Sequence, residues 1–207
     1  MGSGFYDRHL LPRLINLTCG SSVMVPLRGR VCAPLTGHIV EVGFGSGHNI
    51  EAYPPAVTRV SAIEPSDDGW LLGADRIAAS PVPIDRAGLD GQSLPFPDNT
   101  FDGALSTFTM CTIADLPAAL AELRRVLKPA ASLRFLEHGD APDPRVQRWQ
   151  RRLEPVQRRV AGGCHLTRDI PAALTDAGFE ITDLDRFYQH GTPKTFGALS
   201  LGGARTR

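Results

Sequence analysis

Three alternate glycines after a short apolar run are the clearest chemical signal in the chain. The run Ile39-Val40-Glu41-Val42 leads directly into Gly43, Gly45 and Gly47. Because glycine has no side chain, such a turn leaves backbone amides and the start of a following helix open to a ligand. In the glycine pattern of NAD- and FAD-binding proteins the third glycine would stand at His48, so the spacing disfavours a dinucleotide.

Carboxylates follow the glycine turn at the ends of later apolar runs. Glu64 comes directly after the run 60–63. A carboxylate at the carboxyl edge of a sheet can accept both hydroxyls of a ribose, whereas an isolated acid after a strand is about as often merely solvated. In register with the glycine turn, ligand binding is the favoured interpretation. Asp90-Gly91-Gln92 and the run 94–102 offer a further carboxylate and free backbone groups for an adenine ring.

The elements that position these residues alternate along the chain. Apolar, β-branched runs predict strands, and amphipathic stretches between them predict helices. Strands are expected at 38–43, 58–63, 82–85, 101–106, 131–137, 179–187 and 196–201. Helices are expected at 47–53, 67–79, 115–127, 143–160 and 169–177. The alternation predicts one α/β domain with a doubly wound, mostly parallel sheet of seven strands and an antiparallel C-terminal edge.

Composition and charge argue against several classes of function. Lys plus Arg and Asp plus Glu both number 22, for a net charge of +0, which argues against a nucleic-acid partner. No run approaches the ~20 apolar residues of a membrane helix, and the first residues lack the order of a secretory signal, so we predict a cytoplasmic protein without a transmembrane segment. The cysteines form no zinc spacing; no metal is expected, and Cys111 and Cys164 are interpreted as packing residues.

Taken together, the motifs resemble the class I S-adenosylmethionine-dependent methyltransferases. The segments that carry the resemblance are the E-x-G-x-G-x-G turn at 41–47, Glu64, the Asp90 region, the LPFPDNTFD run at 94–102 and the helix end at 124–129. Segments 135–139 and 162–169 are further similar to the branch that contains the methyltransferase-like thiol methyltransferases and their bacterial relatives. One departure is Pro129-Ala130-Ala131, where the family usually has Pro-Gly-Gly, so the local turn is expected to differ.

The resemblance implies a Rossmann-like fold and S-adenosylmethionine as cofactor, with S-adenosylhomocysteine as product. It implies methyl transfer to a small, apolar or lipid-like acceptor through sulfur, nitrogen or oxygen. We expect a single domain, 1–207, with a helical segment at 1–35 that is either an N-terminal cap or a plain packing helix, a cofactor-binding core at 38–140 and a C-terminal helix and edge-strand region at 141–207.

The resemblance also implies a set of cofactor contacts. These are Glu41, Gly43, Phe44, Gly45, Gly47, Asn49, Glu64, Pro65, Ser66, Asp90, Gly91, Gln92, Thr107 and Phe108. Within this set, Glu41 would help to hold the amino group of the cofactor, Glu64 the ribose and Asp90 the adenine. Thr107 and Phe108 would line the methyl-donor end.

Two histidines are the candidates for a general base. A base matters for a thiol acceptor because the thiolate is the nucleophile, although alignment alone can suffice for methyl transfer. His138 follows the fifth strand, where strand ends face the ligand crevice; a histidine bonded to loop backbone is the equal alternative. His165 lies in the segment 162–169, where a capped helix start with Thr167 as the cap is the slightly favoured alternative.

The stretch 143–160 combines six arginines with an apolar stripe at helical spacing. A solvated basic face is the default interpretation, and peripheral contact with lipid headgroups is the minority one. Pro155 is expected to bend or split this helix.

For the whole chain we expect a small-molecule acceptor as partner and a monomer or homodimer. The alternative function is a cofactor-binding module without turnover, acting as a sensor or partner subunit; an NAD-linked oxidoreductase is disfavoured by His48.

Overall fold

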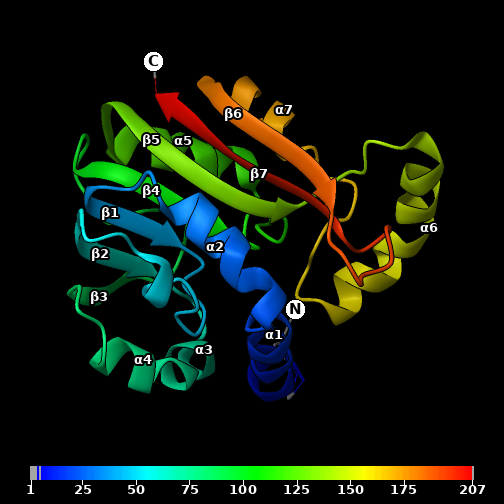
Figure 1. Ribbon diagram of the computed structural model, residues 1–207, viewed down its shortest axis with the longest axis horizontal. Coiled ribbons are helices and arrows are strands. Elements are labelled where there is room, and N and C mark those ends of the chain that lie inside the picture. The colour runs from blue at the N-terminus through cyan, green and yellow to red at the C-terminus, as the bar shows by residue number, and fades with distance from the viewer. Residues whose placement is uncertain (1–3, 5, 207) are drawn as a thin grey trace.

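A computed structural model describes Gly4 and residues 6–206 of the chain (Figure 1). Residues 1–3, 5 and 207 lie outside the described residues, and with them part of the predicted cap at 1–35. Within the described part of the chain, every helix is too short or too polar to cross a bilayer.

The sheet has seven strands in the order β3-β2-β1-β4-β5-β7-β6. They are β1 (Gly37–Val42), β2 (Val57–Ile63), β3 (Ile84–Gly88), β4 (Phe101–Thr107), β5 (Leu127–His138), β6 (Phe179–Tyr188) and β7 (Ala198–Thr206). β1 to β5 run parallel, and β7 lies antiparallel between β5 and β6 (Figure 1). The predicted fold class is therefore confirmed. The direction of winding reverses between β1 and β4, and in such sheets ligands bind at the carboxyl ends of the strands beside that point.

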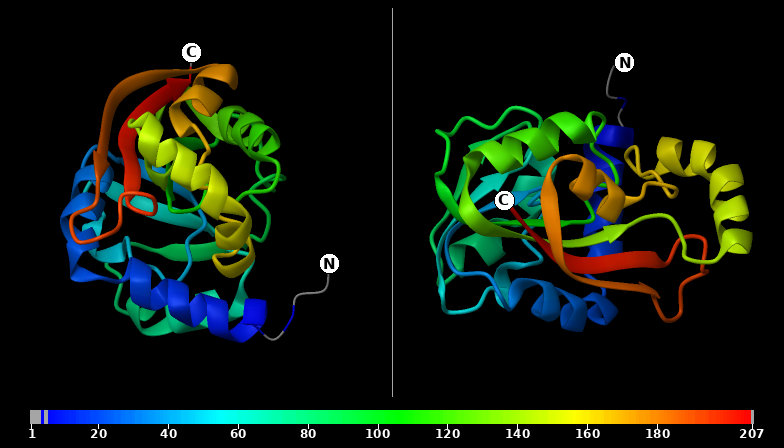
Figure 2. Two further views of the ribbon diagram at one scale, coloured as in Figure 1. Left: turned by 90° about the vertical axis from the view of Figure 1, so that its right-hand side faces the viewer. Right: turned by 90° about the horizontal axis from the view of Figure 1, so that it is seen from above.

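Alternating side chains of the sheet pack into two cores, one on each face. The helical elements are η1 (Tyr6–Leu10), α1 (Leu11–Cys19), η2 (Ser22–Met24), α2 (Val25–Cys32), η3 (Ile50–Ala52), α3 (Asp67–Leu72), α4 (Ala74–Ala78), α5 (Leu116–Val126), α6 (Pro144–Val160) and α7 (Ile170–Asp176). Val40 and Val42 pack with α5 and α7 on one face, whereas Ile39 packs with α2 on the other. Figure 2 shows α5 and α7 on the opposite side of the sheet from α2.

Two predicted helices differ from those observed. The helix expected at 47–53 is only the three-residue turn η3, because Gly47 still has a positive φ of 75° and Pro54 follows Tyr53, which is extended. The helix expected at 67–79 is broken at Gly73 into α3 and α4. A Cβ at Gly73 would lie 2.9 Å from the backbone of Ser46, so this break lets the helices pack closely against the glycine turn.

The basic helix α6 is one continuous element with Pro155 inside it, so of the two expected outcomes, a bend or a split, the split does not occur. The helix projects beyond the sheet (Figures 1 and 2). Of its residues, only Gln150 is buried, and Trp149 is 55% exposed beneath the guanidinium of Arg152, 5.2 Å from the ring centre. The predicted apolar stripe is therefore largely open to solvent.

The expected departure at Pro129-Ala130-Ala131 places an alanine in the left-handed region, since Ala130 has a φ of 61°. This conformation costs a Cβ-bearing residue about 1–2 kcal/mol. We predict that Ala130→Gly raises the free energy of unfolding by about 0.5–1 kcal/mol after the entropy of an added glycine is subtracted, measured by urea denaturation. Ala79→Gly is the matched control: Ala79 is also exposed but has a φ of −87°, so glycine should destabilise the protein there. A loss of stability in Ala130→Gly would contradict the prediction.

Candidate functional site

A cavity of about 280 Å³ opens at the carboxyl ends of β1, β2 and β4. Of the residues expected to contact a cofactor, those that line it are Gly43, Phe44, Gly45, Glu64, Pro65, Ser66, Thr107 and Phe108. The glycine turn and the end of β2 thus meet in one cavity, as their positions after neighbouring strands led us to expect.

The glycine turn combines close packing at one position with open space at another. Gly43 has a φ of 75°, and a Cβ there would lie 1.9 Å from Oγ1 of Thr109. Gly45 has a φ of 59°, but a Cβ there would meet nothing within 4 Å. Since Gly45 lines the cavity, the open space above its backbone is where a ligand can approach.

Glu64 joins the end of β2 to the glycine turn. Its Oε2 accepts a hydrogen bond from the amide of Gly45 at 2.6 Å, and its Oε1 accepts one from the amide of Ser66 at 2.7 Å. The side chain is buried, which raises the pKa of the carboxyl, while the two backbone hydrogen bonds oppose that shift. Each oxygen retains acceptor capacity for a ligand hydroxyl.

A buried polar network lies behind the glycine turn. Glu41 accepts hydrogen bonds from Asn49 at 2.8 Å and from the hydroxyl of Tyr53. Arg28, on α2, donates to Oδ1 of Asn49 at 2.5 Å and to Oγ1 of Thr107 at 3.2 Å. Both oxygens of Glu41 are therefore committed to protein donors, and Glu41 and Asn49 do not line the cavity, whereas Arg28 does.

Arg28 places an unused donor beside the cavity. Its side chain is 5% exposed, and its Nε has no hydrogen-bond partner among the described residues. Its guanidinium carbon lies 5.7 Å from the ring centre of Phe108. A buried, unpaired N–H of a cation is costly, and an anionic group of a ligand would relieve that cost.

The pKa of Glu41 makes stability depend on pH. Burial raises it from 4.5 to about 7, against the opposing hydrogen bonds of Tyr53 and Asn49. The folded state therefore holds a proton that the unfolded chain has already released, so this contribution to stability is complete below pH 4.5 and is lost as the pH rises through 7.

We predict that wild type loses on the order of 3 kcal/mol relative to Glu41→Gln between pH 4.5 and about 7. Glutamine mimics the protonated acid and cannot ionise, so the comparison isolates this one group. Urea denaturation of both proteins at half-unit pH intervals measures the difference. A difference that stays constant across this range would contradict the assigned pKa.

Buried Glu137 organises the loop that follows β4. Its carboxylate accepts hydrogen bonds from the amides of Thr109 and Met110 at 3.0 Å each, from the amide of Cys111 at 3.2 Å and from the hydroxyl of Ser106 at 2.8 Å. Arg168 holds the same loop from outside by donating to the carbonyls of residues 110 and 113. The cavity wall that contains Thr109 is thus fixed by β5 and by the segment before α7.

Phe108 in this loop has a strained backbone. Its φ is 55°, which is rare for a bulky residue, and its amide donates to the carbonyl of Leu136 at 2.9 Å. The ring lines the cavity and lies 4.9 Å from the ring of His138. Such strain persists where surrounding contacts hold the residue in place, and it clusters at ligand sites.

Comparison with known proteins finds a methyltransferase domain in the chain. A model of the methyltransferase domain matches residues 40–135. Thiol S-methyltransferase TMT1B of Rattus norvegicus is 29% identical over 151 residues, which cover 71% of this chain and 62% of that protein. The ubiquinone/menaquinone biosynthesis C-methyltransferase UbiE of Paraburkholderia phymatum is 41% identical over 109 residues, or 51% of this chain and 45% of that protein. These similarities support a class I S-adenosylmethionine-dependent methyltransferase.

Solved structures agree with the fold of this chain. A SAM-dependent methyltransferase from Thermotoga maritima superposes with a TM-score of 0.69 at 19% identity, covering 96% of this chain and 99% of that one. The [4+2]-cyclase SpnF superposes with a TM-score of 0.67 at 22% identity, covering 87% and 80%. This chain spans 59–62% of the length of the thiol methyltransferases it matches.

Several residues expected at the cofactor lie outside the cavity. The turn glycine Gly47 and the segment Asp90-Gly91-Gln92 do not line it. Exposed Asp90 instead accepts hydrogen bonds from the amide and side chain of Gln92, whose Oε1 accepts from the amide of Asp115 at the start of α5. The short side chain of Asp90 thus closes its own turn, and Gln92 supports a helix.

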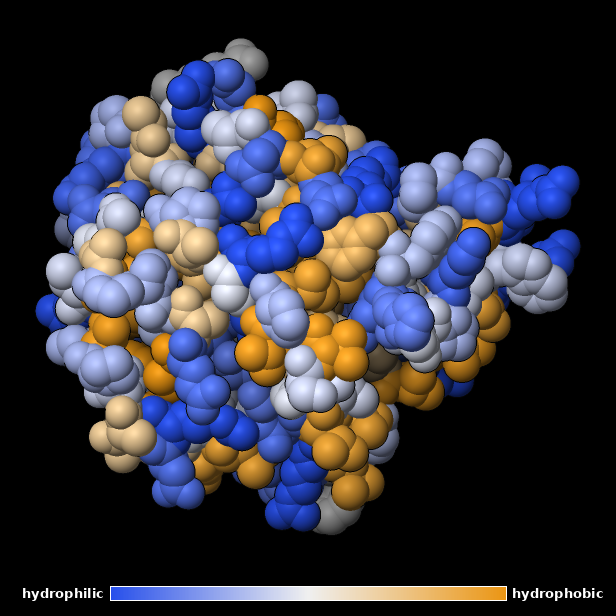
Figure 3. Space-filling view, in the orientation of Figure 1, coloured by the Kyte–Doolittle hydropathy of each residue, from blue (hydrophilic) through white to orange (hydrophobic). Residues whose placement is uncertain are grey.

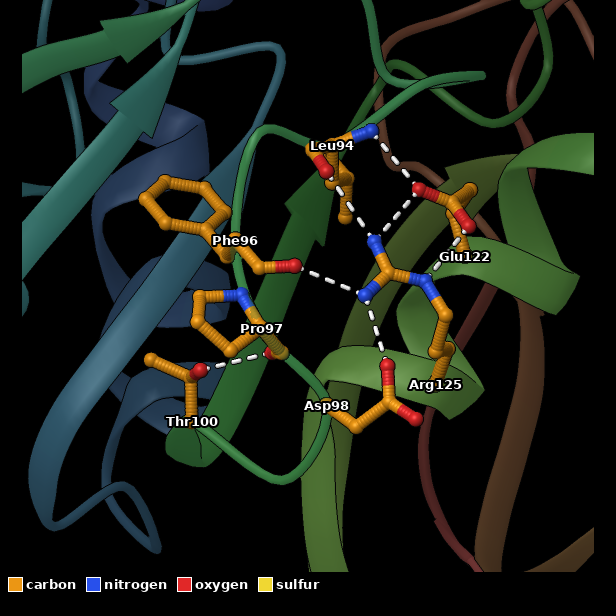
Figure 4. A network of polar contacts seen from close by, with 7 residues as sticks. All are labelled: Leu94, Phe96, Pro97, Asp98, Thr100, Glu122 and Arg125. Carbon is orange, nitrogen blue, oxygen red and sulfur yellow. Dashed lines mark hydrogen bonds and ion pairs between the residues drawn. The ribbon is translucent and has the colours of Figure 1, made fainter.

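The run 94–102 stabilises the methyltransferase fold rather than reaching the cavity. Arg125 on α5 donates to the carbonyls of Phe96 at 2.7 Å and Leu94 at 3.0 Å, and to Asp98 at 2.9 Å (Figure 4). Glu122 accepts from the amide of Leu94 at 2.8 Å (Figure 4). The backbone groups of Leu94 and Phe96, expected to be free for an adenine ring, are thus bonded to side chains of α5.

The two candidate general bases also lie outside the cavity lining. His138 ends β5 beside Phe108. His165 lies 3.1 Å from Oε1 of Glu154 on α6, and the amide of Thr167 donates to the other oxygen at 2.8 Å. The helix cap expected at Thr167 is Asp169, which accepts from the amide of Ala172 at 3.0 Å.

Helix α1, within the segment 1–35 expected as a helical cap, lines one side of the cavity with residues that sequence patterns did not single out. The lining residues from α1 are Leu11, Pro12, Ile15, Asn16 and Cys19. Asn16 accepts from the hydroxyl of Ser46 at 2.7 Å and, through its carbonyl, contacts Nε2 of His48 at 3.0 Å. The outer face of α1 is apolar, with Leu14 50% and Leu17 75% exposed, and orange side chains gather there at the lower centre of Figure 3.

Proposed function

We propose that this chain transfers the methyl group of S-adenosylmethionine to the sulfur of a small apolar thiol. The observation that carries the proposal is the cavity that combines the bare backbone of Gly45, the carboxylate of Glu64 and the unpaired Nε of Arg28. Bound S-adenosylmethionine supplies an activated methyl group on a sulfonium. The relatives named as thiol methyltransferases support sulfur over nitrogen or oxygen, and the apolar residues of α1 suit an apolar acceptor.

The cavity has residues suited to two opposite ends of S-adenosylmethionine, the ribose and the methionine carboxylate. Glu64 accepts the ribose hydroxyls with the lone pairs that Gly45 and Ser66 leave free. Arg28 pairs with the carboxylate of the methionine part, which satisfies its orphaned Nε. Glu41, predicted to hold the amino group, acts in this scheme from behind the cavity by fixing Asn49 and, through it, Arg28.

The cavity provides alignment rather than a base. The titratable side chains among its described lining residues are Cys19, Arg28, His48 and Glu64. Burial and the nearby cations Arg28 and Arg76 lower the pKa of His48 to about 4, so this imidazole is a weak base at neutral pH. The acceptor must then arrive as an anion, and a thiol ionises far more readily than an alcohol.

The test is a methyl-transfer assay with size-matched acceptors: thiophenols of graded pKa, phenol, aniline and a hydroquinone. We expect transfer to the thiophenols, at rates that follow the thiolate fraction. Transfer to aniline or hydroquinone alone would overturn the thiol assignment. Calorimetric binding of S-adenosylhomocysteine without turnover on any acceptor would favour a cofactor-binding module instead.

Gly45→Ala separates cofactor contact from backbone strain. We predict that it weakens binding of S-adenosylhomocysteine at least tenfold, because the new Cβ occupies the open space above the turn. Gly191→Ala is the matched control: Gly191 has a φ of 77° and also has nothing within 4 Å, but it lies outside the cavity. Both variants should lose about 1–2 kcal/mol of stability, and only Gly45→Ala should lose affinity in titration calorimetry. Equal affinities in the two variants would contradict this placement.

A further inference from the structure

Two cysteines and a histidine from distant parts of the chain meet next to the cavity. Cys111 lies in the loop after β4, His138 ends β5, and Cys164 follows α6. Their ligand atoms all lie within 4.8 Å of one another. The cysteines are 1% and 4% exposed, so both thiols are enclosed by protein, whereas His138 is partly exposed.

The geometry of the two thiols matches a shared metal ion. Their Sγ atoms are 3.7 Å apart, and without a metal the thiol of Cys164 donates a hydrogen bond to that of Cys111. Two thiolates on tetrahedral zinc, each at about 2.3 Å from the metal, are separated by about 3.8 Å. A disulfide would require about 2.05 Å, so the sulfurs stand at the spacing for coordination rather than for a covalent bond.

We propose that Cys111, His138 and Cys164 form a binding site for Zn²⁺, with two thiolates and one imidazole as ligands and the fourth position left to water or a small exogenous ligand. This donor set is one that zinc accepts in sites with an open position. On binding, each thiol releases its proton to the buffer as its sulfur–metal bond forms. The two thiolate charges neutralise the dication, which suits an enclosed site.

The surrounding contacts hold the three ligands in place. The amide of His165, next to Cys164, donates to the carbonyl of Cys111 at 2.9 Å. The ring of Phe108 lies 4.9 Å from the ring of His138 and limits its rotation. The backbone on both sides of the cluster is therefore set before a metal arrives, which lowers the ordering cost of binding.

Zinc would tie together two walls of the cavity. Thr109 and Thr112 flank Cys111, and Gly162 precedes Cys164 by two residues; all three line the cavity. Cys111 and Cys164 are 53 residues apart in sequence, so a metal bridge between them closes a long loop and stabilises the folded state. This inference does not depend on the identity of the methyl acceptor.

The test uses Co²⁺ and Zn²⁺ on the reduced, chelator-treated full chain. We expect one equivalent of Co²⁺ to bind with the visible bands of a tetrahedral thiolate complex, Zn²⁺ to displace it, and Zn²⁺ to raise the melting temperature. Cys111→Ser and Cys164→Ser should each weaken Co²⁺ binding at least 100-fold, and His138→Ala at least tenfold. Cys32→Ala, which changes a buried cysteine elsewhere, should bind as wild type does.

A measurement on wild type alone covers the case in which a cysteine variant fails to fold. Zn²⁺ should slow alkylation of Cys111 and Cys164, mapped by mass spectrometry during partial denaturation, and leave alkylation of Cys19 unchanged. Failure to bind Co²⁺ or Zn²⁺ stoichiometrically after reduction would overturn the proposal. Metal binding that persists in the double variant Cys111→Ser/Cys164→Ser, or a lack of protection at these two cysteines, would overturn it as well.

Discussion

Glu64→Ala is expected to weaken binding of S-adenosylhomocysteine by about 100-fold or more. The substitution removes an acceptor for two ribose hydroxyls, and hydrogen bonds to a charged group contribute about 1.5–3 kcal/mol each. It also frees the amides of Gly45 and Ser66, which Glu64 holds at 2.6 and 2.7 Å, so the turn beneath the ligand loses its anchor. Titration calorimetry gives the dissociation constants.

Two further variants serve as controls for the effect of Glu64→Ala on binding. Glu64→Gln retains one carbonyl acceptor and should weaken binding by about tenfold, between wild type and alanine. Glu51→Ala removes an exposed carboxylate outside the cavity and should leave the dissociation constant unchanged. If Glu64→Ala, with its fold verified by circular dichroism, bound within threefold of wild type, the ribose assignment would be wrong.

The second large effect is expected at Glu137. We predict that Glu137→Ala lowers the free energy of unfolding by about 3–5 kcal/mol, because it leaves three backbone amides and one hydroxyl in the protein interior without their acceptor. The loop at 107–112 should lose its fixed geometry at the same time. Urea denaturation measures the stability, and hydrogen exchange of residues 109–111 measures the order of the loop.

The control for Glu137 removes only one of its four contacts. Ser106→Ala deletes the hydroxyl that donates at 2.8 Å and should cost about 1 kcal/mol, with the loop amides still protected. Glu180→Ala, which breaks an exposed ion pair with Arg205, should cost less still. A loss below 1 kcal/mol in Glu137→Ala would show that the loop is held by other means.

Local patterns were sufficient to predict the sheet and one half of the cavity. Strand β1 and the glycines after it are contiguous, and the position of Glu64 follows from the end of the next strand, so parallel pairing alone brings them together. The predicted antiparallel edge likewise depends on two consecutive strands. Each of these predictions uses only short sequence segments and the rule that consecutive elements are usually neighbours in the fold.

The other half of the cavity depends on contacts between distant segments. Arg28 meets Asn49 and Thr107 across 21 and 79 residues, and nothing in the helix around it distinguishes it from a surface arginine. Asp90 shows the opposite case: the sequence suggested a ligand, and in the structure its Oδ1 accepts from the amide and side chain of Gln92, outside the cavity lining. The spacing of residues in the sequence does not show whether a polar side chain will bond to a ligand or to another part of the protein.

Helix α1 buries little of its surface against the rest of the protein, and this affects how ligands enter and leave the cavity. Of its nine residues only Leu11 is buried, and its polar ties to the glycine turn run through Asn16. The sheet side of the cavity belongs to the buried cores, so we expect α1, although Arg28 holds its Cys19 carbonyl at 3.0 Å, to be the side that moves when a ligand enters or leaves. Movement of α1 should therefore control how fast ligands enter the cavity. A bound ligand that contacts both α1 and the sheet side should slow that movement.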